Sequence, residues 1–124
     1  MRTERTRRGD AGERHVRAIL EGCDWQWIAS NWRCPAGELD LVMRDHEMVV
    51  VVEVKVRQGV SRGAAEEAIT AAKARRLLAA GEWFMAEHFP DGQVPWRIDL
   101  FAITLHEMNR VTRRTHIENA VIAG

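Results

Sequence analysis

The sequence has no long apolar run and no apolar segment near its start. Its longest uninterrupted aliphatic stretch covers residues 48–52, far short of the roughly 20 residues that a membrane-spanning helix needs. We therefore expect no membrane association. The arginine-rich start leads into Gly9, Asp10, Gly12 and Glu13 instead of an apolar segment, so we expect no secretory signal and a cytoplasmic location.

Cysteine is scarce, and its positions do not suit a zinc site. Cys23 and Cys34 show neither CxxC spacing nor a mixed Cys/His pattern. In a chain expected in the cytoplasm, the better interpretation is two free thiols that act as small apolar side chains. The five histidines also lack metal-ligand spacing, and we assign none of them a catalytic role.

A net charge of one sign is missing as well. Eighteen basic residues balance eighteen acidic ones, so the bulk charge gives no argument for a polyanionic partner. Of the basic residues, only Lys55 and Lys73 are lysine. Arginine and lysine are near-equivalent on a solvated face, so an arginine-rich chain should keep lysine mainly where a compact ammonium group matters. Both lysines are therefore candidates for function.

The remaining composition indicates one globular domain. The chain has 124 residues, of which 46% are hydrophobic and 29% charged, as in ordinary water-soluble domains of this size. The sequence contains no repeat and no low-complexity block. We expect a flexible N-terminus over residues 1–9 and a single domain over residues 10–120.

The apolar pattern predicts the order helix, three strands, helix, two strands. A first helix over residues 10–22 would have Asp10 as its N-cap and Glu13 in the capping-box position. The predicted strands cover residues 25–32, 38–43, 48–57, 97–103 and 111–117, and a helix capped by Ser61 covers residues 64–78, continuing or restarting to residue 89. Hairpins pair antiparallel and a strand–helix–strand crossover pairs parallel. The fold class is therefore α/β, a mixed sheet flanked by helices.

Charged side chains converge in the hairpin over residues 37–57. Glu53 and Lys55 share one face of the second strand, because alternate strand residues point the same way. A turn near residues 45–46 sets Asp40 opposite Glu53 or one diagonal neighbour away, with Cβ atoms roughly 4.5–8 Å apart. Two carboxylates and an ammonium group therefore meet on a valine-rich strand.

This grouping suits phosphodiester chemistry. Two neighbouring carboxylates repel unless a cation compensates them, and Mg²⁺ prefers one or two carboxylates with water or substrate phosphate completing its shell. Such a cation activates water and stabilises charge on a phosphoryl oxygen, with a lysine beside it. The same alternation also occurs on solvated strand edges with cross-strand ion pairs. The buried, valine-rich context favours the catalytic interpretation, because an idle charge there would cost stability.

Motifs spread along the chain carry a family resemblance. They are Gly12-Glu13-Arg14, Asn31-Trp32-Arg33, the segments 37–42 and 51–57, Lys73, Arg97-Ile98-Asp99 and the segment 116–120. In order and spacing they resemble the YraN-like family of small bacterial proteins, from residue 10 to residue 120. The resemblance implies a single-domain restriction-endonuclease-like fold, similar to that of Holliday junction resolvases, in the order α-β-β-β-α-β-β.

The resemblance also implies roles for individual residues. Asp40, Glu53 and Glu13 would be ligands of Mg²⁺ or Mn²⁺, and Lys55 would be the catalytic lysine of a PD-(D/E)XK nuclease. Glu13 has a competing interpretation as a helix-capping residue. The residue before Asp40 is Leu39 instead of proline, so the first half of the motif is degenerate, as the resemblance implies for the resolvase-like branch of the fold.

Four basic residues are candidates for nucleic-acid binding. Arg33 resembles a phosphate-contacting arginine of the family. Lys73 would lean from its helix toward a substrate phosphate or else lie on a solvated helix face. Arg57 and Arg76 would suit a groove along a phosphate backbone, because arginine binds phosphate through two parallel hydrogen bonds.

These patterns lead to competing hypotheses of function. The first is a metal-dependent nuclease that hydrolyses DNA, branched or single-stranded, with RNA also open. The second is a nucleic-acid-binding module that keeps the nuclease fold without catalysis of its own. A third is a protein–protein adaptor that uses residues 83–85. A homodimer is compatible with the first, because a two-fold junction suits a two-fold protein, but the sequence does not show it.

Overall fold

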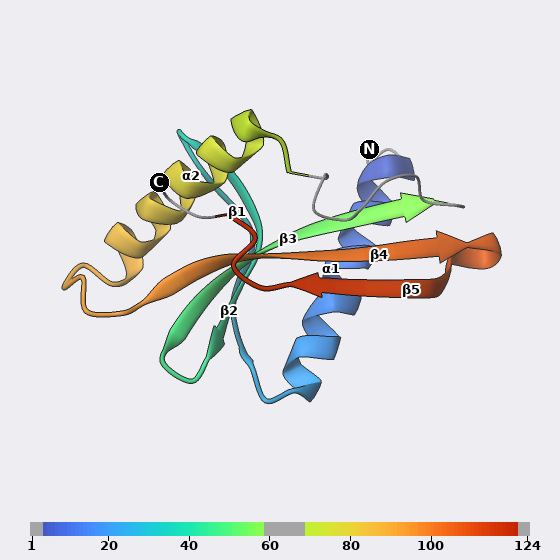
Figure 1. Cartoon of the computed structure of the whole chain (residues 1–124), viewed down its shortest axis with the longest axis horizontal. Coiled ribbons are helices and arrows are strands. Elements are labelled where there is room, and N and C mark those ends of the chain that lie inside the picture. Colours follow the sequence, from blue (N-terminus) through green and yellow to red (C-terminus); the bar gives the residue numbers. More distant parts are fainter. Residues whose placement is uncertain (1–3, 59–68, 122–124) are drawn as a thin grey trace.

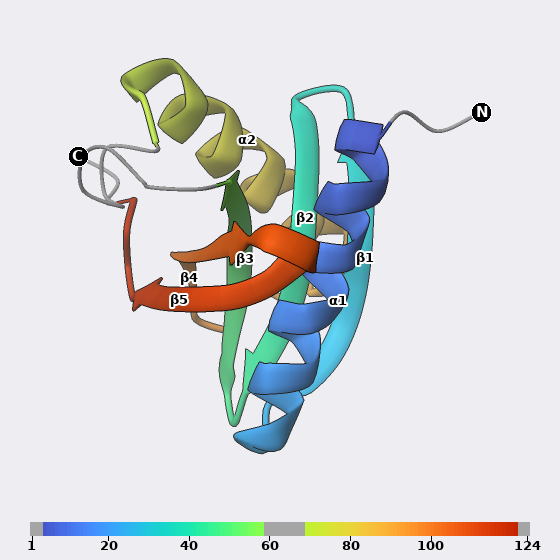
Figure 2. The same ribbon diagram turned by 90° about the vertical axis from the view of Figure 1, so that its right-hand side faces the viewer.

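The chain forms a five-stranded mixed sheet with a helix on each face (Figures 1 and 2). The structure, a computed structural model, describes residues 4–58 and 69–121. Its elements in chain order are α1 (Glu4–Gly22), β1 (Gln26–Cys34), β2 (Gly37–Asp45), β3 (Met48–Gln58), α2 (Ala71–His88), β4 (Trp96–His106), the short 3-10 helix η2 (Glu107–Asn109) and β5 (Arg110–Ile117). The predicted α/β class and element order are confirmed.

The strands lie across the sheet in sequence order, from β1 at one edge to β5 at the other. The pairs β1/β2, β2/β3 and β4/β5 are antiparallel, and β3/β4 is parallel. The parallel pair is the predicted crossover, because α2 lies in the connection between its two strands. The central strand β3 therefore has a long neighbour on each side.

Strand β3 is buried on both faces because its valines alternate between two apolar clusters. Val49 and Val51 pack with residues of α2, and Val50 and Val52 pack with residues of α1. All four are inaccessible to solvent. The first half of β3 thus forms the centre of the core, and its polar residues begin only at Glu53.

The helices differ from prediction at their starts. Helix α1 begins at Glu4 instead of Asp10, because the arginines and glutamate before Gly9 favour helix enough to outweigh that glycine. Asp10 is therefore not an N-cap. Helix α2 has Thr70 as its N-cap, while the expected Ser61 cap and residues 64–68 lie outside the described residues. The expected flexibility of residues 1–9 stays a prediction.

Helix α2 continues through Gly81 to His88. A Cβ atom at Gly81 would collide with the Trp96 ring, so this glycine provides close packing and does not end the helix. No helix in residues 4–58 and 69–121 is both long and apolar enough to cross a membrane.

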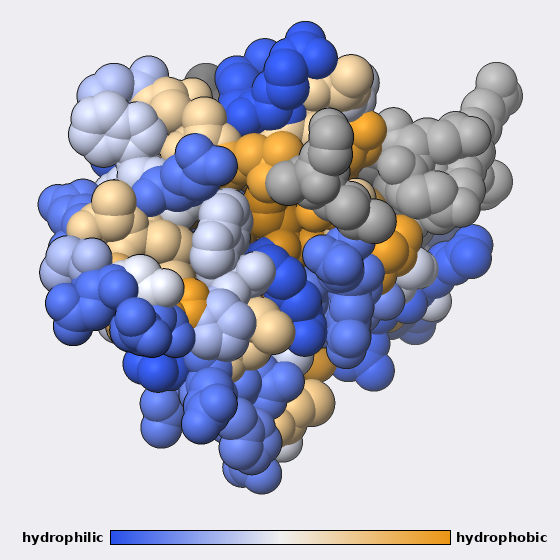
Figure 3. Space-filling model, turned by 60° about the vertical axis from the view of Figure 1, so that its left-hand side comes forward, coloured by the Kyte–Doolittle hydropathy of each residue, from blue (hydrophilic) through white to orange (hydrophobic). Residues whose placement is uncertain are grey.

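Few large apolar side chains are exposed in the described part of the chain. They are Trp27, Trp83 and Met108. The face shown in Figure 3 is mainly hydrophilic, with apolar residues gathered near its middle. Of the proposed adaptor segment, Trp83 is exposed but Phe84 and Met85 are buried, so that segment does not form a continuous contact surface. Both cysteines are free thiols, as predicted.

Candidate functional site

Asp40 lies where β2 and β3 separate. The pairing of the two strands ends at Leu41 and Val52. Beyond that point the Asp40 carboxylate, in place of the β2 backbone, accepts the Val54 N–H at 3.0 Å. The side chain thereby enters the gap between the strands, where it shares a hydrogen bond with Glu53. The predicted proximity of these two carboxyl groups is confirmed.

Glu53 is a buried carboxyl group that is paired with a lysine of α2. Its side chain is 10% exposed, and its Oε2 lies 2.9 Å from the Nζ of Lys73. Lys73 sits in the first turn of α2, where its backbone N–H donates to the Thr70 hydroxyl at 3.1 Å. The ammonium group nearest the acid pair therefore comes from the helix. Lys55, on β3 itself, is exposed.

The surroundings of Asp40 disfavour its charged form. Burial raises the pKa of Asp40 to about 8, and the hydrogen bond and repulsion from Glu53 act in the same direction, against the Val54 N–H and Lys73. At neutral pH Asp40 is therefore largely protonated. Glu53, the other member of the pair, lies against the ammonium group of Lys73.

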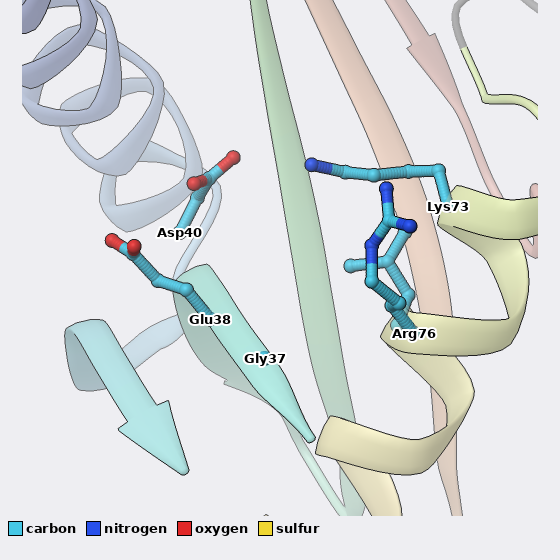
Figure 4. Close-up of a pocket in the computed structure, with 6 residues that line it drawn as sticks. Gly37, Glu38, Asp40, Lys73 and Arg76 are labelled. Carbon is cyan, nitrogen blue, oxygen red and sulfur yellow. The ribbon is translucent and has the colours of Figure 1, made fainter. Parts of the chain in front are cut away.

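A pocket of about 150 Å³ opens beside this acid pair. It is lined by Gly37, Glu38, Asp40, Lys73, Arg76 and Leu77. Figure 4 shows Lys73 and Arg76 extending from α2 toward the strand that bears Glu38 and Asp40. The pocket thus has an acidic wall on β2 and a basic wall on α2.

The other basic candidates lie at or beyond the edge of this pocket. Arg33 is exposed, and its Nε lies 3.4 Å from Oε2 of Glu38, which lines the pocket. The pocket lining, within the described residues, includes neither Lys55 nor Arg57. The structure thus brings together Asp40, Glu53, Lys73 and Arg76 from the predicted site.

Glu13 occupies a separate polar network on α1. It is 7% exposed, and its Oε1 accepts a hydrogen bond from the Ser30 hydroxyl at 2.6 Å. The Trp27 ring N–H donates to the same hydroxyl at 2.9 Å. Because α1 begins at Glu4, the capping interpretation of Glu13 is wrong. Its role as a metal ligand stays a prediction, since the described histidine, cysteine and acidic side chains form no group of three or more suited to a metal.

Asp40 and Glu53 by themselves suit a divalent cation. Mg²⁺ is usually held by one or two protein carboxylates, while water and substrate phosphate complete its shell. Burial and the neighbouring Glu53 disfavour the charge on Asp40, and a dication would compensate that charge. On the opposite wall, Lys73 and Arg76 suit phosphate oxygens. The donor set therefore fits Mg²⁺ or Mn²⁺ together with a phosphate.

Another buried acid, Asp99, has no role in the predicted site. Its carboxylate contacts Nε of Arg97 at 2.9 Å, Nε2 of His116 at 2.8 Å and the Asn119 N–H at 2.9 Å. Burial raises the pKa of Asp99, but the hydrogen bonds from His116, Arg97 and Asn119 outweigh burial and hold it below its usual value. Asp99 is thus a charged anchor that ties β4 to β5 and the C-terminal segment. The motifs Arg97-Ile98-Asp99 and 116–120 carry part of the family resemblance, but the sequence does not indicate that they are in contact.

A family model matches most of the chain, and relatives match nearly all of it. The model of a family described as "Uncharacterised protein family UPF0102" matches residues 12–103. A UPF0102 protein of Roseiflexus castenholzii is 40% identical over 98% of each chain. Proteins of the same description from Chloroflexus aurantiacus and Pseudomonas putida are 39% identical over 98% and 41% identical over 79% of each chain.

Proposed function

This chain belongs to the UPF0102 family, the YraN-like proteins that its motifs resemble, and from its site we propose that it is a metal-dependent nuclease hydrolysing phosphodiester bonds in DNA. One observation carries the proposal: the hydrogen-bonded Asp40–Glu53 pair adjoins a pocket whose opposite wall presents Lys73 and Arg76. Carboxylates suit the cation and the basic groups suit the phosphate that it would polarise. The α-β-β-β-α-β-β order also agrees with the restriction-endonuclease-like fold that the resemblance implies.

In this proposal Asp40 and Glu53 hold Mg²⁺ or Mn²⁺, which when bound would lower the pKa of a water ligand and stabilise charge on a phosphoryl oxygen. Lys73 and Arg76 bind and orient the phosphate from the α2 side. Arg33, near the mouth of the pocket, would contact the neighbouring backbone, as would Arg57 farther along β3. Buried surroundings restrict water around the acid pair, which strengthens each electrostatic contact.

Two residues of the proposal, within the described part of the chain, lie outside the pocket lining. Lys55 lies on the same strand as Glu53 but is exposed, and it is proposed as the catalytic lysine. Glu13 is proposed as an additional acid near the metal. Separate variants of both residues would show whether either one acts with the Asp40–Glu53 pair.

The test is a panel of linear, flapped, four-way and single-stranded DNA and of RNA, each with Mg²⁺, Mn²⁺ or EDTA. We expect cleavage of at least one substrate by the wild type with divalent metal, and loss of cleavage in Asp40→Asn and Lys55→Ala with binding largely retained. Glu87→Gln, an exposed change on α2, is the matched control. Cleavage that persists in EDTA or in Asp40→Asn would refute the nuclease assignment.

A nucleic-acid-binding module without catalysis is the second candidate. The observation that favours it is that the described histidine, cysteine, aspartate and glutamate side chains form no group of three or more suited to a metal, while the basic wall would bind phosphate unaided. Salt-dependent DNA binding without Mn²⁺ binding in calorimetry would support this candidate over the nuclease. Light scattering of the protein with a four-way junction would test the proposed homodimer.

A further inference from the structure

Lys73 occupies a position that the nuclease proposal leaves unexplained. Its Nζ is 2.9 Å from Oε2 of Glu53, so the lysine is bound to a proposed metal ligand before any substrate arrives. Glu53 in turn shares a hydrogen bond with Asp40. An ammonium group at this distance and a dication on the same carboxyl group would repel each other.

The lysine is held firmly at its backbone and loosely at its tip. Thr70 caps the turn through the Lys73 N–H, and the buried Leu77 fixes the same helix onto the core. The side chain, by contrast, is 42% exposed and ends in a flexible four-carbon stem. The ammonium group can therefore leave Glu53 without any movement of α2.

An alternative binding partner for Lys73 would be available in the same pocket. Lys73 and Arg76 both line it from α2, and Figure 4 shows the two side chains on the same wall. A phosphate held by Arg76 would lie within reach of a released Lys73. The pocket thus offers the lysine an anion after Glu53 is taken by another cation.

We propose that Lys73 is the resident counter-ion of the Asp40–Glu53 pair, and that it transfers from Glu53 to a substrate phosphate when a divalent cation takes the carboxylates. This inference rests on the proposed metal-dependent function. In the metal-free protein, Lys73 of the basic wall is paired with Glu53. Metal binding would free the positive charge of Lys73 for the phosphate. Lys73 thereby couples cation binding to substrate binding at one site.

The experiment measures Mn²⁺ affinity by calorimetry without nucleic acid, and thermal unfolding in EDTA. Removing the competing ammonium in Lys73→Gln should tighten Mn²⁺ binding about two- to fivefold, the factor expected for a partly exposed ion pair. In EDTA the same variant should unfold at a lower temperature, because Glu53 loses its partner. Lys73→Arg should restore wild-type values for both. Lys73→Ala is measured in parallel, so that the test can still be carried out if one of the two variants does not fold.

Arg75→Gln is the matched control, because Arg75 is exposed on the same helix and does not line the pocket. It removes one positive charge from α2 and should leave Mn²⁺ affinity unchanged. Equal or weaker Mn²⁺ binding by the folded Lys73 variants would overturn the counter-ion inference and leave the nuclease proposal standing. Absence of Mn²⁺ binding by the wild type would instead refute the metal-dependent function itself.

Discussion

The Asp40 carboxylate accepts the backbone N–H of Val54 at 3.0 Å, just past the last paired residues of β2 and β3. The Asp40 side chain thus takes the place of the β2 backbone, which has diverged from β3. It satisfies the Val54 N–H, a backbone donor that would otherwise be left unpaired. The same contact holds Asp40 in a fixed position against Glu53. The divergence of two strands is therefore what creates the acidic site in the middle of a sheet.

Metal binding at this pair should release a proton. Because the pKa of Asp40 is raised to about 8, the metal-free pair is protonated at pH 7, whereas a cation binds the carboxylate form. We expect about one proton released per Mn²⁺ at pH 7, falling toward zero well above pH 8, and an affinity that rises with pH in between. Calorimetry in buffers of different ionisation enthalpy measures this directly. A binding heat that is independent of the buffer would contradict it.

The stability of the metal-free protein should follow the same carboxyl group. The folded-state pKa lies above the ordinary value of 3.8, so the folded state binds the extra proton, and Asp40 weakens stability as pH rises from about 4 to about 8. Asp40→Asn removes this dependence and retains an oxygen for Val54. In EDTA at pH 8 we expect the variant to melt higher than the wild type by about 2–8 °C, with a smaller difference near pH 5. Equal differences at both pH values would contradict the raised pKa of Asp40.

Gly12 controls how closely α1 approaches the sheet. A Cβ atom there would collide with Val56 and touch Ile103, whereas a Cβ at Gly22, in the same helix, would meet nothing within 4 Å. Gly12→Ala should therefore destabilise the protein by about 1–3 kcal/mol through overpacking. Gly22→Ala is the matched control and should stay within about 0.5 kcal/mol of the wild type. Urea unfolding of both variants gives the comparison, and equal stability would mean that α1 shifts without cost.

Part of this arrangement follows from sequence, and part depends on packing. The position of a hairpin turn sets which residues face each other, so the proximity of Asp40 and Glu53 could be predicted from the chain alone. The contact between Glu53 and Lys73 could not be predicted, because it depends on where α2 begins and on how Leu77 and Phe84 pack α2 against β3. The contact between Asp99 and His116 could not be predicted for the same reason. Local patterns predict strands and registers, while contacts between distant elements require the assembled core.

Removing the buried anchor Asp99 should destabilise the whole domain. Asp99→Ala leaves Arg97 and His116 without their carboxylate and frees the Asn119 N–H, so we expect a loss of about 3–5 kcal/mol in urea unfolding. Asp91→Ala, in an exposed loop, is the control. The folded-state pKa of Asp99 is lowered, so its contribution is present above the ordinary value of 3.8 and disappears as pH falls through the folded-state value. The wild type should therefore lose more stability than the folded variant Asp99→Asn below about pH 4.

Arg76 provides the most direct test of the basic wall. It lines the pocket beside Lys73, while its neighbour Arg75 is exposed outside the lining. If Arg76 contacts a phosphate, Arg76→Gln should weaken DNA binding on every sequence and reduce the slope of log affinity against log salt by about one. Arg75→Gln removes the same charge from the same helix and should change the slope less. Fluorescence anisotropy over a series of salt concentrations measures both variants. Equal effects would mean that DNA responds to the overall charge of α2 and does not enter the pocket, because a contact inside the pocket must depend on which arginine is lost.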